Sequence, residues 1–435
     1  MPTPNSLPSP GLPAGASVLV LGAGLAGVCA AWYLAEAGYR VTVVDRQPGP
    51  GLETSFANGG QISVSHPEPW SSPQVFGLLA RWLFRENAPV RLRPRLDPRQ
   101  WAWCLQFLGQ CLPGPHHRNT AHIAGLALYS RARLQALRTG LGLNYDQQTR
   151  GILHLAFSAR ELAEMERRQP RLRQFGMAVE VVDAPRCRAL EPALAASALP
   201  LAGGMYASED ESGDAHLFCR ALADACGKAG VRFLHGVTVR ALAVAHGRVT
   251  GAELTDTEGG RYTLRGDAVV VALGSFSPAL VSALGERLSI YPLKGYSVTV
   301  PLLQPERAPR VSLTDESARI VVSRLGDRLR LAGTAEIGGY DTAVDVRRCR
   351  AILQHGVRLF PQLEAEWTGA RFWAGLRPAT PGNVPCIGLS QRYANLYYNT
   401  GHGTLGWTLA CGSAKALADI VAGRQPEPDF PFLTG

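Results

Sequence analysis

The segment SVLVLGAGLAG, residues 17–27, decides the fold of this 435-residue chain. Its first five residues form a short, mainly apolar run, which is typical of a parallel strand covered on both faces. Gly-x-Gly-x-x-Gly follows at 22–27, and residues 28–37 have the composition of a helix that Gly38 ends. A second β-rich run, residues 40–45, completes a predicted strand–turn–helix–strand unit.

The three glycines of this turn suit a bound dinucleotide. Gly22 permits a tight turn, Gly24 lets a pyrophosphate approach the backbone, and Gly27 lets the helix pack on the strand. The free N–H groups and the dipole at the helix N-terminus favour an anion there. Asp45 ends the next strand and can accept hydrogen bonds from a ribose diol. A tight turn without a ligand is the alternative. The expected contacts are Val20, Gly22, Ala23, Gly24, Leu25, Ala26, Gly27, Asp45 and Arg46.

The start of the chain allows two other interpretations. Residues 18–35 carry no charge, as a membrane span would, but the glycine spacing and the strand-then-helix order favour a nucleotide-binding turn. Residues 1–16 are rich in Pro, Ser and Gly and lack the basic and apolar regions of a secretory signal. We expect a disordered leader there.

The bulk properties exclude several classes of protein. Composition is near globular averages, and the formal charge of +9 says nothing about fold. The nine cysteines are scattered without a CxxC pair, which argues against a disulfide framework or a zinc site. His116, His117 and His154 have no partners at metal-ligand spacing. We predict no metal site.

The distribution of strand patterns predicts two domains. Runs typical of doubly buried strands lie at the start, middle and end of the chain, and alternating strands lie between them. We expect an α/β protein: a Rossmann-like nucleotide domain assembled from discontinuous segments, with an inserted α+β substrate domain that has a mixed or antiparallel sheet. The segments are 17–75, 204–280 and 385–423 for the first domain, and 76–203 and 281–384 for the second.

A second glycine-rich turn, NTGHGTLGW at 399–407, precedes another predicted helix. One such turn binds a pyrophosphate. A second one, in a flavoenzyme, faces the pyrimidine edge of the flavin, where its N–H groups stabilise the charge of the reduced ring. We therefore favour FAD over NAD, with an ordinary helix start as the alternative. The residues concerned are Gly401, His402, Gly403, Thr404, Leu405 and Gly406.

Four long motifs, in this order, carry a family resemblance. They are LETSFANGGQIS (52–63), YPLKGYS (291–297), WAGLRP (373–378) and TGHGTLGW (400–407). The chain resembles the small-subunit type of D-amino acid dehydrogenase over residues 18–423. This family belongs to the wider group that contains D-amino acid oxidase, glycine oxidase and sarcosine oxidase. The resemblance implies FAD, and we expect it to be noncovalent.

The resemblance places FAD contacts on particular residues. Thr54 and Ser55 would lie near the phosphates, and Val239 would border the adenine. Ala272 and Gly274 would belong to a second strand end that contacts the nucleotide. The residues expected along the flavin ring are Asn58, Gly59, Gly60, Gln61 and Ile62.

The resemblance also implies substrate contacts. Arg377 matches an arginine that pairs with the substrate carboxylate, a task that suits the guanidinium fork. A salt bridge between domains is the alternative. Lys294, Tyr296 and Arg324 lie on predicted strands and face either the site or solvent. His402 would donate to the flavin or shape its turn.

One loop departs from the family pattern. After Arg377 and Pro378 the family continues Met/Gly-Thr-Pro-Asp-Gly-x-Pro, whereas residues 379–385 read ATPGNVP. The expected aspartate is therefore missing at Gly382. Either the loop is reshaped around Asn383, or the substrate range differs.

The activity that this resemblance implies is oxidative deamination of a D-amino acid. Hydride would pass from Cα to flavin N5, and water would hydrolyse the imino acid to a 2-oxo acid and ammonia. Positioning would do most of this work, so no dedicated base is required. Spacing does not distinguish a quinone from oxygen as electron acceptor, and the family favours a respiratory one. The alternatives are an enzyme for sarcosine, glycine or a proline derivative, a flavin-binding electron-transfer subunit, and, more remotely, an RNA-modification enzyme.

Residues 81–103 combine arginines with tryptophans. This mixture fits the surface of an anionic membrane. It also fits a solvated helical face with buried tryptophans. No nucleic-acid-binding motif accompanies the charges. We expect a cytoplasmic protein, either free or peripheral on the cytoplasmic face of the inner membrane.

Overall fold

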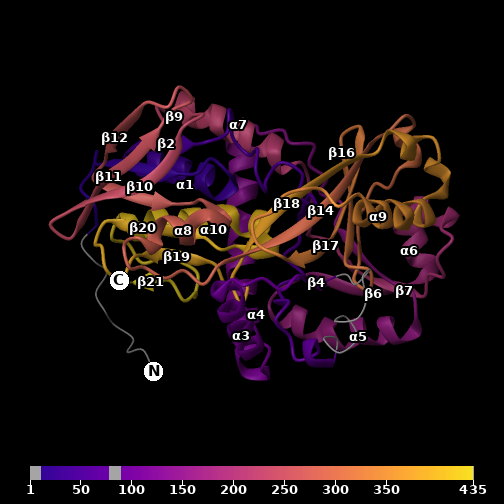
Figure 1. The fold of residues 1–435 in the computed structure, drawn as a ribbon. Coiled ribbons are helices and arrows are strands. Elements are labelled where there is room, and N and C mark those ends of the chain that lie inside the picture. The colour runs from indigo at the N-terminus through magenta and orange to yellow at the C-terminus, as the bar shows by residue number, and fades with distance from the viewer. Residues whose placement is uncertain (1–10, 78–89, 435) are drawn as a thin grey trace.

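The computed structural model describes residues 11–77 and 90–434. Its first sheet has seven strands in the order β21-β19-β20-β13-β1-β2-β9, of which β1, β2, β9, β13 and β20 are parallel (Figure 1). These strands come from three distant parts of the chain. They are β1 (Ser17–Leu21), β2 (Arg40–Asp45), β9 (Arg232–His235), β13 (Ala268–Val271), β19 (Cys386–Leu389), β20 (Leu396–Thr400) and β21 (Leu433–Thr434).

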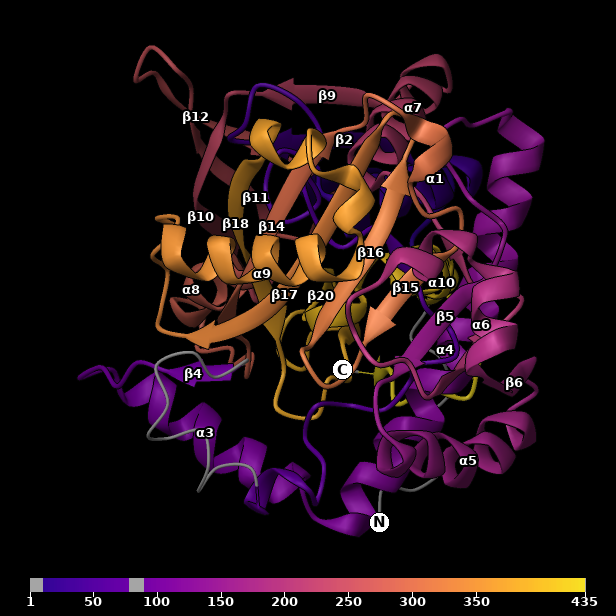
Figure 2. The ribbon, with the colours of Figure 1, turned by 90° about the vertical axis from the view of Figure 1, so that its right-hand side faces the viewer.

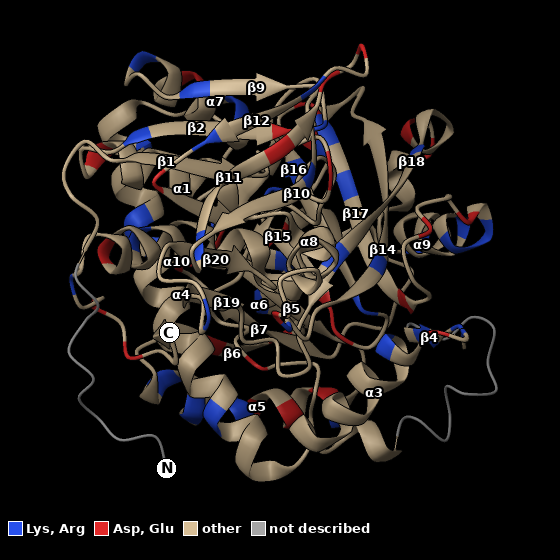
Figure 3. Ribbon diagram, turned by 60° about the vertical axis from the view of Figure 1, so that its left-hand side comes forward, with Lys and Arg blue, Asp and Glu red and all other residues tan. Residues whose placement is uncertain are grey.

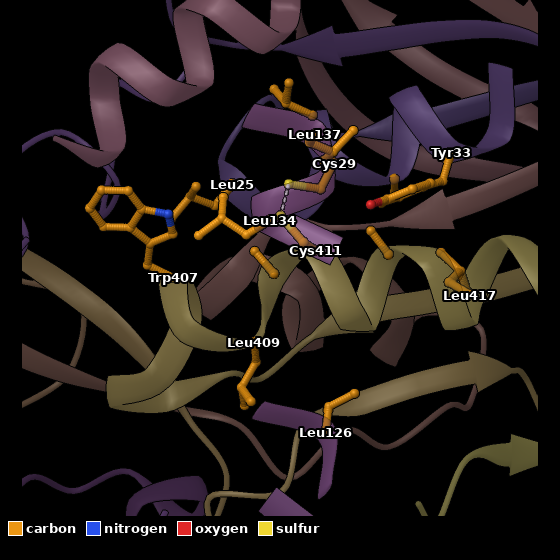
Figure 4. Packing of buried hydrophobic residues seen from close by; sticks show 14 of the residues in the cluster. Leu25, Cys29, Tyr33, Leu126, Leu134, Leu137, Trp407, Leu409, Cys411 and Leu417 are labelled. Carbon is orange, nitrogen blue, oxygen red and sulfur yellow. Dashed lines mark hydrogen bonds between the residues drawn. The ribbon is translucent and has the colours of Figure 1, made fainter. Parts of the chain in front are cut away.

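The central strands of this sheet are apolar on both sides, so both of its faces must be covered. Helices cover one of them. The helices α1 (Leu25–Glu36), α7 (Ala215–Lys228) and α10 (Gly406–Val421) share a buried cluster with β1. The longer helix α4 (Pro113–Leu141) packs against α10 in the same cluster. Figure 4 shows this packing, with the Sγ atoms of Cys29 and Cys411 3.9 Å apart.

The other face of the seven-stranded sheet is covered by a small antiparallel sheet and a short helix. The small sheet consists of β10 (Thr238–Ala245), β11 (Arg248–Thr255) and β12 (Arg261–Arg265), and the helix is α8 (Ser277–Ser282). Leu19 and Leu21 of β1 point into this second cluster, whereas Val18 and Val20 point to the helices. The period-two alternation of the strand thus supplies both faces.

A nine-stranded mixed sheet forms the second half of the molecule, in the order β18-β14-β17-β16-β15-β5-β7-β6 with β4 paired to β17. Figures 1 and 2 show helix α9 (Val346–Leu359) lying across one face of this sheet. The strands are β4 (Val90–Leu92), β5 (Ile152–Ala156), β6 (Val179–Asp183), β7 (Gly203–Ala207), β14 (Tyr291–Pro301), β15 (Ser312–Asp315), β16 (Ile320–Leu325), β17 (Arg328–Ile337) and β18 (Arg371–Ala379).

The remaining elements connect these layers. The short strands β3 (Gln61–Ile62) and β8 (Glu211–Ser212) pair with each other. The remaining helices are α3 (Pro98–Gln110), α5 (Ala159–Gln174) and α6 (Ala184–Leu190). Short 3₁₀ helices occur at Pro192–Ala196, Gly274–Phe276, Pro305–Arg307, Pro361–Leu363, Glu366–Gly369 and Gly403–Leu405.

The predicted α/β class is confirmed, and β1 and β2 have the predicted bounds. One detail differs from the expectation, and another agrees with it. Residues 11–16 are not a disordered leader, because Leu12 N donates to Val421 O (2.9 Å) and Ala16 is buried; residues 1–10 lie outside the described part. Residues 18–35 form β1, a turn and most of α1 rather than a membrane span, and no described helix is long and apolar enough to cross a bilayer.

Candidate cofactor and substrate site

A cavity of about 550 Å³ lies where the two large sheets face each other. One wall is built by the turn after β1 and by the ends of β2, β13 and β20. The opposite wall is built by β14, β17 and β18, and residues 53–61 run between the two walls. The cavity therefore lies at the carboxyl ends of the parallel strands, where open α/β sheets bind ligands.

The glycines of the first turn are not all required for the same reason. Gly22 has φ 108°, and a Cβ at Gly27 would lie 1.8 Å from Gly22 O, so the fold itself requires both glycines. A Cβ at Gly24 would meet only Ser55 Oγ, at 3.6 Å. The protein alone therefore does not require glycine at this position. The open space in front of the α1 N-terminus fits a dinucleotide pyrophosphate.

Asp45 both shapes this turn and lines the cavity. Its carboxylate accepts hydrogen bonds from Ala23 N (2.6 Å) and Gln47 N (2.8 Å). Burial raises its pKa. Each carboxylate oxygen can still accept a second bond, as a ribose hydroxyl would require. Arg46 beside it pairs with Glu53 (2.7 Å) and lies over the Phe276 ring.

Most of the predicted cofactor residues meet at this cavity. Thr54 donates to Leu376 O (2.7 Å), and Ser55 Oγ accepts from Leu25 N (3.2 Å) at the start of α1. Those that line the cavity are Gly22, Gly24, Leu25, Ala26, Asp45, Arg46, Thr54, Ser55, Asn58, Gly59, Gly60, Gln61, Val239, Ala272, Gly274, His402, Gly403, Thr404, Leu405 and Gly406. Those that lie behind its wall are Val20, Ala23, Gly27, Ile62 and Gly401.

His402 holds the second glycine-rich turn in place. Its side chain is 3 % exposed, and Nε2 lies 3.0 Å from Ser413 Oγ on α10. Burial lowers its pKa to about 4, so the imidazole is neutral at neutral pH. Of the two predicted roles, this geometry supports the shaping of the turn.

Asn383 stands at the bend of the loop formed by residues 379–385. This residue has φ 59°, and its Nδ2 donates to Thr404 Oγ1 (3.4 Å) in the second glycine-rich turn. A Cβ at Gly382 would lie 2.5 Å from Asn119 Nδ2 on α4. The position of the missing aspartate is thus packed against a helix, and the asparagine after it contacts the turn.

Arg377 is a cation without an anionic partner among residues 11–77 and 90–434. It lines the cavity from β18, and its Nη1 donates to the backbone O of Thr334 (3.1 Å). A Cβ at Gly295 would lie 2.1 Å from Nη1, so the glycine of the YPLKGYS motif makes room for the guanidinium. Burial lowers the pKa to about 10, which leaves the group charged. Among the described residues it forms no ion pair, so the alternative of an interdomain salt bridge finds no support.

Of the two other predicted catalytic residues, Tyr296 lines the cavity and Lys294 does not. Lys294 is 3 % exposed and pairs with Asp341 (3.1 Å). Tyr296 borders it, but its ring is buried among the residues under α9, close to the charged groups of Lys294 (5.5 Å) and Arg348 (5.6 Å). Arg324 donates to two backbone carbonyls at a hairpin end. Lys294 is therefore corrected to a structural residue of β14, whereas Tyr296 stays a predicted site residue.

Several cavity residues were not predicted from the sequence. They are His66, Trp70, Glu316, Arg319 and Thr334. His66 and Trp70 come three and seven residues after the end of the LETSFANGGQIS motif, and this proximity was the one signal in the sequence that could have indicated them. The others lie at strand ends and in a bulge of β17, where no local pattern marks them.

The comparisons with known proteins agree with this fold. A family profile described as "DAO: FAD dependent oxidoreductase" matches residues 17–420. A curated "D-amino acid dehydrogenase" from Dechloromonas aromatica (strain RCB) is 53% identical over 416 residues, which are 96% of this chain and 99% of the relative. Another, from Rhizorhabdus wittichii, is 46% identical over 94% of this chain and 97% of its own.

A solved structure shows the same fold. Glycine oxidase from Geobacillus kaustophilus superposes with a TM-score of 0.74 at 24% identity, covering 95% of this chain and 97% of its own. At that identity the likeness concerns the fold alone.

Proposed function

The chain belongs to the FAD dependent oxidoreductase (DAO) family, and we propose that it is a D-amino acid dehydrogenase that oxidises the Cα–N bond of a small D-amino acid. One observation of the site carries this proposal. Arg377 places a positive charge, which no described carboxylate pairs with, in a cavity whose other end suits a dinucleotide. The names and full-length identity of the curated relatives support the D-amino acid as substrate.

The residues around the cavity fit FAD. We assign it to the segments 17–75, 204–280 and 385–423, with its pyrophosphate in front of Gly24 and its ribose at Asp45. The turn at 401–406 would face the flavin, and Asn58 and Gln61 would lie along it. When bound, FAD supplies an acceptor for the two electrons of the substrate C–H bond, which yields an imino acid that water hydrolyses to a 2-oxo acid and ammonia.

The chain's own contribution to the reaction is positioning. Arg377 would bind the substrate carboxylate through two parallel hydrogen bonds, and the low dielectric around it strengthens that contact. Gly295 leaves the space in which the guanidinium lies flat on β14. The segments 76–203 and 281–384 would thereby fix the substrate against the cofactor, and correct orientation alone supplies a large part of the rate.

We further propose that the electrons pass to a quinone or another respiratory acceptor, with peripheral contact to the cytoplasmic face of the inner membrane. Residues 81–89 lie outside the described part, but the following ones support the idea. Trp103 is buried, whereas Leu96, Trp101, Leu105 and Leu112 expose apolar side chains on or beside α3. Figure 2 shows α3 at the edge of the molecule beside β4, where Figure 3 shows basic residues.

An anaerobic reduction experiment tests the substrate assignment. The oxidised holoenzyme is mixed separately with D-alanine, L-alanine, sarcosine and L-proline, and the visible flavin band is recorded. Bleaching by D-alanine alone supports the proposal. Bleaching by another amine alone would replace the substrate, and a fully loaded flavin that no amine bleaches would contradict the proposal.

A further inference from the structure

The wall of the cavity carries a partly buried network of charged residues around Glu316. Glu316 lies in the turn between β15 and β16 and lines the cavity together with His66. Its carboxylate accepts from both sides: Arg168 Nη1 lies 2.9 and 2.7 Å from its two oxygens, and His154 Nδ1 lies 3.1 Å from Oε1. His66 Nε2 approaches the same Oε1 at 3.8 Å and stacks on the His154 ring.

One arginine serves two carboxylates in this network. Arg168 comes from α5, along which Figure 3 shows both basic and acidic residues, and it also donates to both oxygens of Glu68 (3.1 and 3.2 Å). Glu68 does not line the cavity. Among the acidic residues and arginines joined by these contacts, Glu316 and Glu68 carry two negative charges and Arg168 one positive charge. Arg319 lies in the same turn as Glu316, with its guanidinium over the Trp70 ring, and no ion pair joins it to a described carboxylate.

The protonation states keep that negative charge at the cavity. Burial alone would raise the pKa of Glu316, but Arg168, His154 and His66 together hold it well below its usual range. Burial lowers the pKa of His66, against the opposing effect of Glu316. The charged and titratable groups that face His66 are Glu316, Arg168, Glu68 and His154. At neutral pH the cavity is therefore bordered by an ionised carboxylate beside a neutral imidazole.

The anion and the cation of the cavity are tied together through one residue. Thr334, in the bulge of β17, accepts from Arg377 Nη1 with its carbonyl (3.1 Å) and donates its N–H to Arg319 O (3.4 Å). Arg319 belongs to the turn that carries Glu316. The cavity thus presents a positive group and a negative group on adjacent segments, as a zwitterion requires.

We propose that Glu316 binds the ammonium group of the zwitterionic substrate and that His66 accepts the proton that this group must lose before oxidation. The inference rests on the proposed function and extends it to the nitrogen end of the substrate. In this step one N–H bond of the ammonium breaks, its electron pair stays on the amine nitrogen, and a new N–H bond forms on the imidazole. Glu316 then stabilises the imidazolium.

The binding half is tested with Glu316→Gln and the matched control Glu68→Gln, which removes the other carboxylate from Arg168 away from the cavity. Two readouts are compared in the holoenzyme: anaerobic flavin reduction by D-alanine, and binding of propionate, which lacks the amine, followed by its perturbation of the flavin spectrum. Loss of a charged contact predicts that Glu316→Gln lowers the second-order rate of reduction by about 10- to 100-fold and leaves propionate affinity unchanged or higher. Glu68→Gln should stay within about threefold in both.

The proton-accepting half is tested with His66→Asn, which keeps a polar side chain of similar length. Its reduction rate should fall by about 100-fold near neutral pH and approach the wild-type rate at about pH 10, where the free amine is abundant. An equal loss at both pH values overturns this half. Equal loss of D-alanine and propionate binding in Glu316→Gln, or no difference from Glu68→Gln, overturns the other. If no D-amino acid reduces the wild-type flavin, the proposed function fails, and this inference falls with it.

Discussion

Substitution by alanine should have different effects at Gly24 and Gly27: it should leave the folded apoprotein nearly unchanged at Gly24 and disrupt its packing at Gly27. Gly24 has ordinary extended angles, φ −76° and ψ −178°, and a Cβ there would touch only Ser55 Oγ at 3.6 Å. Gly24→Ala should therefore change the free energy of unfolding of the apoprotein by about 1 kcal/mol or less, the usual effect of alanine at a helix N-cap. A Cβ at Gly27 would lie 1.8 Å from Gly22 O, so Gly27→Ala must displace α1 from β1.

Gly24→Ala should, however, weaken the affinity of the protein for FAD. The added methyl group would occupy the space in front of the α1 N-terminus where the pyrophosphate binds, and hydrogen bonds to a charged group are worth about 1.5–3 kcal/mol each. Loss of one such bond weakens FAD affinity by about 10-fold or more. The assay is thermal unfolding of apoprotein, followed by FAD titration with the quenching of flavin fluorescence.

Gly24→Ala with wild-type FAD affinity would refute the placement of the pyrophosphate at this helix. If Gly24→Ala destabilised the apoprotein as much as Gly27→Ala does, the protein itself would require glycine at both positions. Gly27→Ala should give little folded protein, and it therefore serves as the reference for a substitution that disrupts packing.

Three further results are expected. Arg377→Met should lower kcat/KM for a D-amino acid by about 100-fold through loss of the charged contact, with FAD content unchanged, and a smaller loss than tenfold would remove Arg377 from the carboxylate site. The folded pKa of His402, about 4, lies below the value of 6.5 in the unfolded chain, so stability rises with pH across that window by up to about 3 kcal/mol. Urea unfolding of His402→Asn should lack this gain, and an unchanged pH dependence would contradict it. Asn383→Ala should cost about 1–2 kcal/mol because φ is 59°, and Asn383→Gly should cost less; calorimetry of the two variants checks the order.

The parts of the fold that the sequence predicts are those with strong local signals. The apolar runs of β1 and β2 are typical of strands buried inside a parallel sheet, and their bounds were predicted to the residue. Other elements lack such a local signal. The three residues of β4 form a strand because they pair with β17. That pairing is a contact between distant segments, which no local period reports.

The residues of the candidate site were likewise predicted where a local motif marks them and missed where distant segments meet. Motifs with a fixed spacing predicted most of the residues that line the glycine-turn side of the cavity, because a glycine turn and a helix start lie within a few residues of each other. Strand position alone misplaced Lys294, since the side of β14 that faces the cavity depends on where the sheet lies. The network of Glu316 could not be predicted, because Arg168, His66 and His154 come from separate segments.

The bulge of β17 connects these observations. Thr334 is a β-branched residue with φ 57°, and its Oγ1 is buried without a hydrogen-bond partner among the described residues, two features that each cost stability. A regular strand would avoid both costs, but it would turn the carbonyl of this residue into the ladder instead of toward Arg377. The strained backbone is over-determined by β14 and β16 on either side. Strain of this kind persists where the surrounding structure enforces it, and here it brings the unpaired cation and the turn of Glu316 to one cavity.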